Sequence, residues 1–384
     1  MPVLYDETDT IRDIFVHEPG LECRIALEAE DPSVWLFDPV LKGVKGSEWI
    51  EQARREHSQY VKLLQKQGIQ VHYLTVLLKQ HEPMLRMKLE EALKSAVTQK
   101  LITTEYAEDF SKQIHMSPVS AALCGVTMKF EDYYKLEDAG LSILIPKPNA
   151  YFTQDPFAII GNHFVKLKPA AWQRSGEPEL WEIALQPNPE YFYQMQNIAE
   201  GGDITIINKK VFVGVGTRTE THAAQEIYKN RARFGCIDDV VVVLKPDSGK
   251  KLGLNHSVEL PYIHQDTIWM PLYNGKVVGN LKLIEACVTW YFANGGQLKT
   301  FKDYITNSQQ KKIVPVSEKE QYSLAPNVLP TNGVVISADV NVETNTALTK
   351  HGFDVKTFVA KTLLGGAGSG HCMSNVANYC FSVN

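Results

Sequence analysis

Residues 203–208, DITIIN, and residues 210–216, KVFVGVG, are two short runs rich in β-branched residues. Runs of this length and composition are typical of strands. Four more runs of the same kind predict strands at 11–17, 69–74, 239–245 and 333–339. Predicted strands are therefore spread over most of the chain.

Helices are predicted between these strands. Residues 47–67 place apolar side chains on one stripe at helical spacing, and Gly68 ends the run. Further helices are predicted near 281–293 and 343–352. The alternation of strands and helices predicts an α/β fold.

The stretch from 76 to 148 breaks this alternation. Its segments MLRMKLEEALKSAVTQK, at 84–100, and TEYAEDFSKQIH, at 104–115, have helical spacing. The first strand predicted after them is SILI, at 142–145. We therefore predict a helical insertion over 76–148. Because no low-complexity linker joins it, it is expected to pack on the body formed by 1–75 and 149–384.

The composition excludes several classes of protein. Of the 384 residues, 44% are hydrophobic and 22% are charged, which is typical of a folded chain and not of disorder. The net charge of -5 argues against nucleic acid or anionic lipid as the main partner. The first residues do not resemble a secretory signal, and no stretch reaches the ~20 apolar residues of a membrane span. A cytoplasmic protein with a small-molecule substrate is therefore expected.

The cysteines are scattered without C-x-x-C pairs, which is typical of reduced thiols and not of a disulfide or zinc framework. They are Cys23, Cys124, Cys236, Cys287, Cys372 and Cys380. A thiol with a special role must therefore be identified by its neighbours.

One such thiol is Cys372, in LLGGAGSGHCMSN at 363–375. Glycines let a backbone approach a ligand closely, so this segment predicts a flexible rim beside the thiol. His371 is weak support, because adjacent residues often point in different directions. The alternative is a glycine-rich turn with an incidental cysteine.

A second candidate is YIHQDTIWM at 262–270, in which His264 and Asp266 are two residues apart at the start of a strand-like run. Period-two spacing predicts that both side chains lie on one face of a strand. One could transfer protons while the other binds a cation. The alternative is a hydrogen-bonded pair on the surface.

Two more acids lie in predicted loops. Asp155 belongs to NAYFTQDPF at 149–157, and Glu200 belongs to AEGGD at 199–203, directly before a predicted strand. Acids in such loops are placed to face a cleft, although both motifs are also ordinary turn sequences.

Together these residues fit one chemical task. A guanidinium is a planar cation that is best bound by carboxylates, and Asp155, Asp266 and Glu200 could supply them. Its carbon is a poor electrophile, so the reaction needs a thiolate nucleophile and a proton donor for the departing amine. Cys372 and His264 suit those two roles.

The chain resembles the guanidine-modifying superfamily, and within it the arginine deiminase family. The resemblance covers nearly the whole chain, in the order FVHEPGLE at 15–22, WLFDP at 35–39, NAYFTQDPF, EGGD, HQDT and GHCMS. It implies a pseudo-fivefold α/β propeller with the active site on its axis. The helical insertion is similar to the one that distinguishes arginine deiminases from shorter relatives.

The resemblance also implies roles for individual residues. Cys372 matches the nucleophile, His264 the general acid and base, and Glu200 the acid that orients this histidine. Asp155 and Asp266 match the two carboxylates that bind the guanidinium.

Further matches imply the contacts to the rest of the substrate. Asn149 and Phe152 match substrate-binding positions, and Arg174 and Arg218 match arginines that bind the α-carboxylate. Two such arginines favour an amino acid over a simple amine as substrate.

The chain departs from the family pattern in two places. The family's R-G-G-P-R-C loop is GGAGSGHC here, so one carboxylate-binding arginine is absent, and T-R-D-P is TQDP. Losing one charge-assisted hydrogen bond costs roughly 1.5–3 kcal/mol of binding free energy. These departures therefore bear on which guanidino compound is the substrate and not on the reaction class.

The implied reaction is hydrolysis of L-arginine to L-citrulline and ammonia through a covalent adduct on Cys372. No metal or organic cofactor is expected, in agreement with the lack of His/Cys ligand clusters in the sequence. The alternatives are an arginine dihydrolase, an amidinotransferase and a non-catalytic arginine-binding protein. A thiol protease is a further alternative, but it does not explain the three carboxylates. The sequence leaves open whether the chain forms a homo-oligomer.

Overall fold

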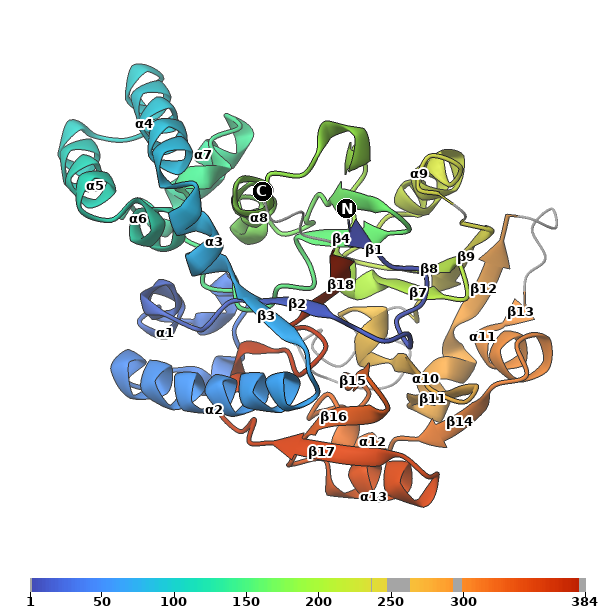
Figure 1. Ribbon diagram of the computed structural model, residues 1–384. Coiled ribbons are helices and arrows are strands. Elements are labelled where there is room, and N and C mark those ends of the chain that lie inside the picture. Colours follow the sequence, from blue (N-terminus) through green and yellow to red (C-terminus); the bar gives the residue numbers. More distant parts are fainter. Residues whose placement is uncertain (1, 236, 247–262, 293–298, 380–384) are drawn as a thin grey trace.

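The structure is a computed structural model, and it describes residues 2–235, 237–246, 263–292 and 299–379. Within these ranges the strands form five separate sheets, with helices around them (Figure 1). The predicted α/β class is confirmed. All six predicted strands are present, as β2 (Asp13–Val16), β3 (Gln70–Tyr73), β7 (Ile204–Ile207), β8 (Lys210–Val215), β9 (Asp239–Leu244) and β16 (Val334–Ala338).

Each of the five sheets contains the same unit, in which two antiparallel strands are followed by a third strand that runs parallel to the second. In the sheet of β7, β8 and β9, the helix α9 (Thr221–Asn230) connects the two parallel strands. The fifth unit joins the two ends of the chain, because β18 (Asn375–Tyr379) pairs antiparallel with β2, and β2 pairs parallel with β3. The amphipathic helix α2 (Gly46–Lys66) connects β2 to β3.

The other three units have the same order. Their strands and connecting helices are β4 (Phe157–Ile160), β5 (His163–Lys166), α8 (Glu177–Leu185) and β6 (Phe192–Gln194); β10 (Trp269–Leu272), β11 (Lys276–Gly279), α10 (Leu281–Ala286), α11 (Phe301–Asp303) and β14 (Lys312–Pro315); and β15 (Leu329–Thr331), β16, α13 (Val342–Lys350) and β17 (Asp354–Phe358). Three strands, β1 (Pro2–Val3), β12 (Val288–Tyr291) and β13 (Lys299–Thr300), extend two of the sheets.

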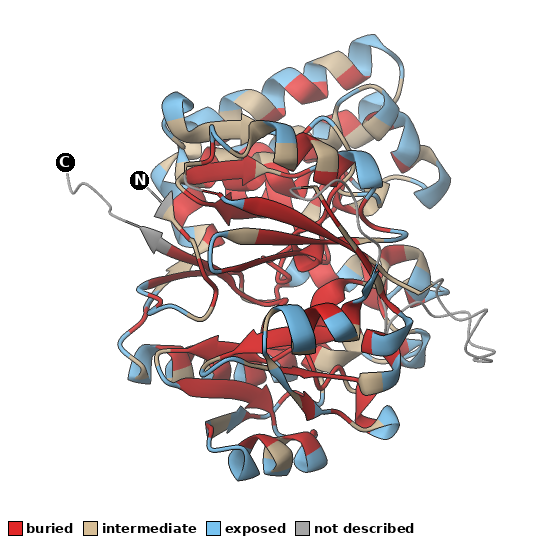
Figure 2. Ribbon diagram, turned by 90° about the vertical axis from the view of Figure 1, so that its right-hand side faces the viewer, coloured by how far each residue is buried: buried red, intermediate tan, exposed pale blue. Residues whose placement is uncertain are grey.

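Local sequence explains two of the hairpins. Asn208 and Lys209 connect β7 to β8, and Asn332 and Gly333 connect β15 to β16; all four residues have positive φ. Two-residue turns with positive φ match the twist of the flanking strands, and Asn and Gly adopt this conformation at little cost. Most residues of the strands are buried, whereas the outer faces of the helices are exposed (Figure 2).

Two predicted elements are wrong. Residues 142–145 were predicted as a strand, but Ser142–Leu144 is a 3₁₀ helix, because the buried ammonium of Lys147 binds the carbonyl oxygens of Ser142, Ile143 and Ile145 and bends the chain. The helix predicted near 281–293 ends at Ala286, since the next residues form β12, which pairs antiparallel with β9.

Residues 76–148 are all described, and they contain helices and no strand. The helices α4, α5, α6 and α7 gather at the upper left of Figure 1. The helices of this region, with the one that leads into it, are α3 (Leu74–Gln80), α4 (Glu82–Thr98), α5 (Thr104–Met116), α6 (Pro118–Cys124) and α7 (Tyr133–Asp138). The division into a body and an insertion stays a prediction.

The described helices also include two short ones, α1 (Arg24–Leu27) and α12 (Glu318–Gln321). None of the helices in the described ranges has both the length and the apolar composition needed to span a membrane. Four of the cysteines are free thiols, namely Cys23, Cys124, Cys287 and Cys372. Cys236 and Cys380 lie outside the described residues.

Candidate active site

A small cavity of about 30 Å³ brings most of the predicted site residues together. It is lined by eight of them: Asn149, Phe152, Asp155, Arg174, Glu200, Arg218, His264 and Cys372. Leu36, Ile263, Gly366 and Ala367 complete the lining. The ninth, Asp266, does not line the cavity but lies directly behind it, with its Oδ2 3.6 Å from Sγ of Cys372.

The five repeated units explain why these residues meet. Each unit contributes polar residues from the loop directly before its first strand: Asp155 before β4, Glu200 before β7, His264 and Asp266 before β10, Asn327 before β15, and Cys372 before β18. Residues that are far apart in the sequence thus occupy equivalent places in successive units.

Cys372 is buried, and neighbouring loops fix its backbone. Its N–H donates to Oδ1 of Asn327 at 3.1 Å, and its carbonyl oxygen accepts from the N–H of Gln154 at 3.1 Å. Burial raises the pKa of the thiol well above its ordinary value, and the negative charges of Asp266 and Asp155 raise it further. The thiol is therefore protonated when the cavity holds no cation.

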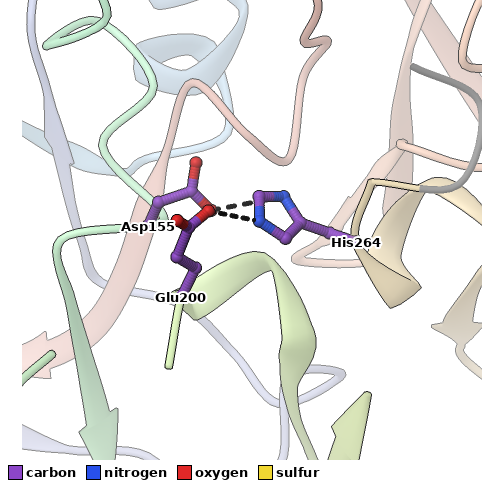
Figure 3. Close-up of side chains that lie close together, drawn as sticks. All are labelled: Asp155, Glu200 and His264. Atoms are coloured by element: carbon purple, nitrogen blue, oxygen red, sulfur yellow. Dashed lines mark hydrogen bonds and ion pairs between the residues drawn. The ribbon is translucent and has the colours of Figure 1, made fainter. Parts of the chain in front are cut away.

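His264 faces two neighbouring carboxylates, which both point toward its ring (Figure 3). Nε2 is 2.7 Å from Oε2 of Glu200, and Nδ1 is 3.6 Å from Oδ1 of Asp155. Burial alone would lower the pKa of the imidazole, but Asp155 and the hydrogen bond to Glu200 outweigh it and raise the pKa to about 9. At neutral pH His264 is a cation with a proton to give.

Glu200 is fully buried, and both of its carboxylate oxygens have partners. Its Oε1 accepts from the N–H of Ala170 at 2.9 Å and lies 3.5 Å from Nη1 of Arg218. Burial would raise the pKa of this carboxyl, yet His264 and Arg218 together hold it far below its ordinary value. Glu200 is thus a fixed negative charge that orients the imidazolium.

Asp155 is held by Arg174, which contacts it through Nη1, and by the N–H of Gly202, at 3.0 Å from Oδ1. The remaining guanidinium nitrogens of Arg174 bind Glu177, with Nη2 at 2.6 Å from Oε2, and the carbonyl oxygen of Phe152, at 2.9 Å. Arg174 lines the cavity, but in this structure its donors are directed at protein acceptors.

Asp266 reaches the site from a 3₁₀ turn, Gln265–Thr267, and not from a strand. The prediction that His264 and Asp266 share one face of a strand is therefore wrong; β10 begins only at Trp269. The turn forms because the N–H of Gln265 donates to the buried carboxylate of Asp203 at 2.8 Å. Lys245 holds this carboxylate, with Nζ at 2.7 Å from Oδ1.

The glycines before Cys372 let the segment pass close to aromatic rings. A Cβ at Gly366 would lie 1.4 Å from the hydroxyl oxygen of Tyr151, and one at Gly368 would lie 2.2 Å from the ring of Phe152. Only glycine fits at these two positions without rearrangement. Asn149 lines the cavity too, although its amide donates to the carbonyl oxygen of Trp35 at 2.8 Å.

The sequence model of the arginine deiminase family matches residues 45–378. The chain belongs to the arginine deiminase family. The predicted family and the predicted class of enzyme, a hydrolase of amidine C–N bonds, are confirmed. Among its relatives, the arginine deiminase of Treponema denticola is 25% identical over 96% of both chains, and that of Metamycoplasma arthritidis is 26% identical over 97% of this chain and 95% of the relative.

Solved structures show that the fold is shared more widely than the sequence. A variant of DDAH from Pseudomonas aeruginosa, complexed with citrulline, has a TM-score of 0.56 and 15% identity, and the alignment covers 96% of this chain and 100% of that one. The product-bound N-terminal domain of ArgZ, an arginine dihydrolase from cyanobacteria, has a TM-score of 0.55 and 14% identity over 96% and 97% of the two chains.

One group in the described part of the chain has the composition of a metal site. Asp155, Glu200 and His264 place ligand atoms within 4.8 Å of one another. In this arginine deiminase family member, however, both ring nitrogens of His264 face these carboxylates, and arginines bind the same carboxylates. His264 cannot be both a metal ligand and the proton donor, so these residues fit the second role better.

The sequence did not single out two residues that contact the site: Asn327 binds the backbone of Cys372, and Glu177 binds Arg174. His371, which the sequence offered only as weak support for Cys372, has its side chain 2.8 Å from Asp266. The position of Asn327 directly before a strand, like Glu200 before β7, is a signal that could have found it.

Proposed function

We propose that this member of the arginine deiminase family hydrolyses L-arginine to L-citrulline and ammonia, with Cys372 as the nucleophile. The proposal rests on one observation: a buried thiol, an imidazolium and separate carboxylates lie around one cavity. A guanidinium needs carboxylates to bind it, a thiolate to attack its carbon and a proton donor for the departing amine. The site supplies all three.

The guanidinium binds between Asp155 and Asp266 in this proposal. Oδ1 of Asp266 is buried and has no hydrogen-bond partner among the described residues, so it is available to an N–H of the substrate. Because the cavity is smaller than an arginine side chain, the residues around it must move apart when substrate binds. Arg218 is the better placed of the two predicted arginines to bind the α-carboxylate, since its one ion pair with a described residue, Glu200, is long at 3.5 Å.

The bound cation also activates the nucleophile. Burial raises the pKa of the Cys372 thiol, and Asp266 and Asp155 raise it further while no cation lies between them. A bound guanidinium neutralises both carboxylates, and its positive charge beside the sulfur favours the thiolate against the effect of burial, so the thiol releases its proton once substrate is bound. The reactive thiolate is then present only together with its substrate.

In the first half-reaction, the thiolate forms a C–S bond to the guanidinium carbon and gives a neutral tetrahedral adduct. His264 protonates one NH₂ group, the C–N bond breaks, and ammonia leaves behind a cationic thiouronium on Cys372. His264 is now neutral. It therefore takes a proton from water as the water oxygen attacks the same carbon, and the C–S bond breaks to restore the thiolate. The ureido product releases its extra proton, so arginine and water give citrulline and ammonium in balance.

The five repeated units support a finer description of the fold. They match the blades of a pseudo-fivefold α/β propeller, with the site where the five loops converge. Residues 76–148 then form a helical subdomain inserted into the body of residues 1–75 and 149–384.

A product assay tests the proposal. Incubation with L-arginine, agmatine and methylated arginines, with ammonia, ureido products and ornithine measured side by side, should give citrulline and ammonia in equal amounts from arginine. Ornithine would instead indicate a dihydrolase. Cys372→Ala should abolish turnover, whereas Cys124→Ala, which removes a thiol elsewhere in the chain, should not. Full activity in Cys372→Ala would refute the proposal.

A further inference from the structure

His371, directly before the nucleophile, lies between two acids from distant parts of the chain. Its Nδ1 is 2.8 Å from Oδ2 of Asp266, and its Nε2 is 3.5 Å from Oε2 of Glu7. All three side chains are buried. His371 therefore connects the N-terminal segment after β1 with the turn before β10.

The surroundings of His371 keep its ring charged. Burial alone would lower the pKa of the imidazole, but Asp266 and Glu7 outweigh it and raise the pKa to about 10. The second acid is a weaker partner, because burial raises the pKa of Glu7, and Asp6 behind it raises that pKa further. Asp266 is thus the main counterion.

The two oxygens of Asp266 differ sharply. Oδ2 faces both His371 and the thiol of Cys372, whereas Oδ1 is buried without a hydrogen-bond partner in the described part of the chain. An unpaired buried carboxylate oxygen is costly, and such atoms in folded proteins usually have a functional reason. A donor from a bound substrate would satisfy it.

We propose that His371 is a positioning residue for substrate binding: its imidazolium binds Oδ2 of Asp266 and so leaves Oδ1 to receive the guanidinium. The proposal rests on the proposed function, because it takes the substrate to be a guanidino compound.

The charge of His371 also sets how strongly Asp266 attracts a cation. Without the imidazolium, Asp266 would be a buried carboxylate with no cationic partner among the described residues, and such groups take up a proton readily. A protonated Asp266 does not attract a guanidinium. The loss of His371 should therefore weaken binding, and more so toward acid pH.

Equilibrium binding separates this role from catalysis. In a Cys372→Ala background, which removes both turnover and the thiol, we would measure the dissociation constant of L-arginine by calorimetry from pH 6 to 8. Adding His371→Gln should weaken binding at least tenfold at pH 7 and more at pH 6. Adding His371→Arg, which restores a charge, should return the affinity to within about threefold of the parent. His351→Gln, at an exposed histidine, should change nothing.

Two results would overturn the proposal: parent-like affinity in His371→Gln, or equal weakness in His371→Arg and His371→Gln. The ring titration of His371, followed by NMR in histidine-labelled protein, gives a second readout without substrate. Asp266→Asn should lower the pH at which the ring loses its proton by at least one unit, and an unchanged titration would also refute the proposal. If the Cys372→Ala variant itself bound no arginine, the proposed function would be refuted instead. The NMR titration would still show whether His371 is paired with Asp266.

Discussion

Asp155 and Asp266 are both buried beside Cys372, but a different kind of cation neutralises each one. Asp155 is bound by Arg174, which is in turn bound by Glu177. Asp266 is bound by His371, which is in turn near Glu7. On both sides, a cation lies between the catalytic carboxylate and a second acid.

The difference lies in whether the cation can be discharged. A guanidinium stays protonated at any pH that a folded protein tolerates, whereas an imidazole loses its proton within the accessible range. The positive charge beside Asp155 is therefore permanent, whereas the positive charge beside Asp266 depends on pH. The following predictions test how far this asymmetry holds.

The largest expected effect is a loss of activity, and it should be the same for Asp155 and Asp266. Asp155→Ala and Asp266→Ala each remove the acceptor of charge-assisted hydrogen bonds to the guanidinium, each worth roughly 1.5–3 kcal/mol. With two such bonds per carboxylate, kcat/KM for arginine should fall by about 10²–10⁴-fold in either variant. Steady-state kinetics measure this loss, with Asp354→Ala as the control at an exposed aspartate. Near-normal turnover in either variant would show that this carboxylate does not bind the substrate.

Stability should distinguish the two sides. Asp155→Ala leaves the buried guanidinium of Arg174 with one acid fewer, and breaking a buried pair in this way costs about 3–5 kcal/mol. Asp266→Ala should cost clearly less, because His371 can become neutral. Urea unfolding at pH 7 measures the difference. Equal losses in the two variants would mean that the nature of the cation does not matter.

Much of the fold follows from local sequence. The runs at 203–208 and 210–216 form strands because β-branched residues suit a sheet, and Asn208 adopts the conformation that the turn between them needs. The segments at 142–145 and 281–293 were predicted wrongly because distant groups decide them, namely the ammonium of Lys147 and the pairing of β12 with β9. Periodicity within a segment does not report on either.

The site shows the same limit. Residue types and family motifs pointed to eight residues that line one cavity and to Asp266 behind it. They did not reveal what each side chain binds. Arg174 was expected to bind the substrate carboxylate, yet here it binds Asp155, and His371 binds an acid 105 residues away in the sequence. Such partners follow from the arrangement of the loops in space.

The pH dependence of stability should reveal the titratable side. Because the pKa of His371 is raised to about 10 in the fold, its stabilising effect is complete below about pH 6.5 and is lost as the pH rises through 10. Asp266→Asn removes the main counterion, so the free energy of unfolding should fall less between pH 7 and 10 than in the wild type, by on the order of 2 kcal/mol. His264 titrates in both proteins and largely cancels in the comparison. Parallel pH profiles would contradict the assignment of Asp266 as the counterion.

The smallest expected effect concerns the two arginines. If Arg174 supports Asp155, Arg174→Lys should lower kcat/KM for arginine and for agmatine by similar factors, because both substrates carry the guanidinium.

Arg218→Ala should behave differently. Agmatine is arginine without the α-carboxylate, and Arg218 has only one long ion pair within the described site, to Glu200. A single charge-assisted bond to that carboxylate is worth roughly 1.5–3 kcal/mol, so arginine should be preferred over agmatine by about 10–100-fold, and Arg218→Ala should remove most of this preference by lowering turnover of arginine alone. Arg218 also lies near Glu200, the acid that orients His264. An equal fall of kcat/KM with both substrates would therefore mean that Arg218 acts through Glu200 and not on the α-carboxylate of the substrate. If Arg174→Lys removed the preference for arginine over agmatine instead, Arg174 would have to leave Asp155 and bind the α-carboxylate when substrate binds. The cation beside Asp155 would then not be a permanent support, and the Asp155 and Asp266 sides would differ less than the structure shows.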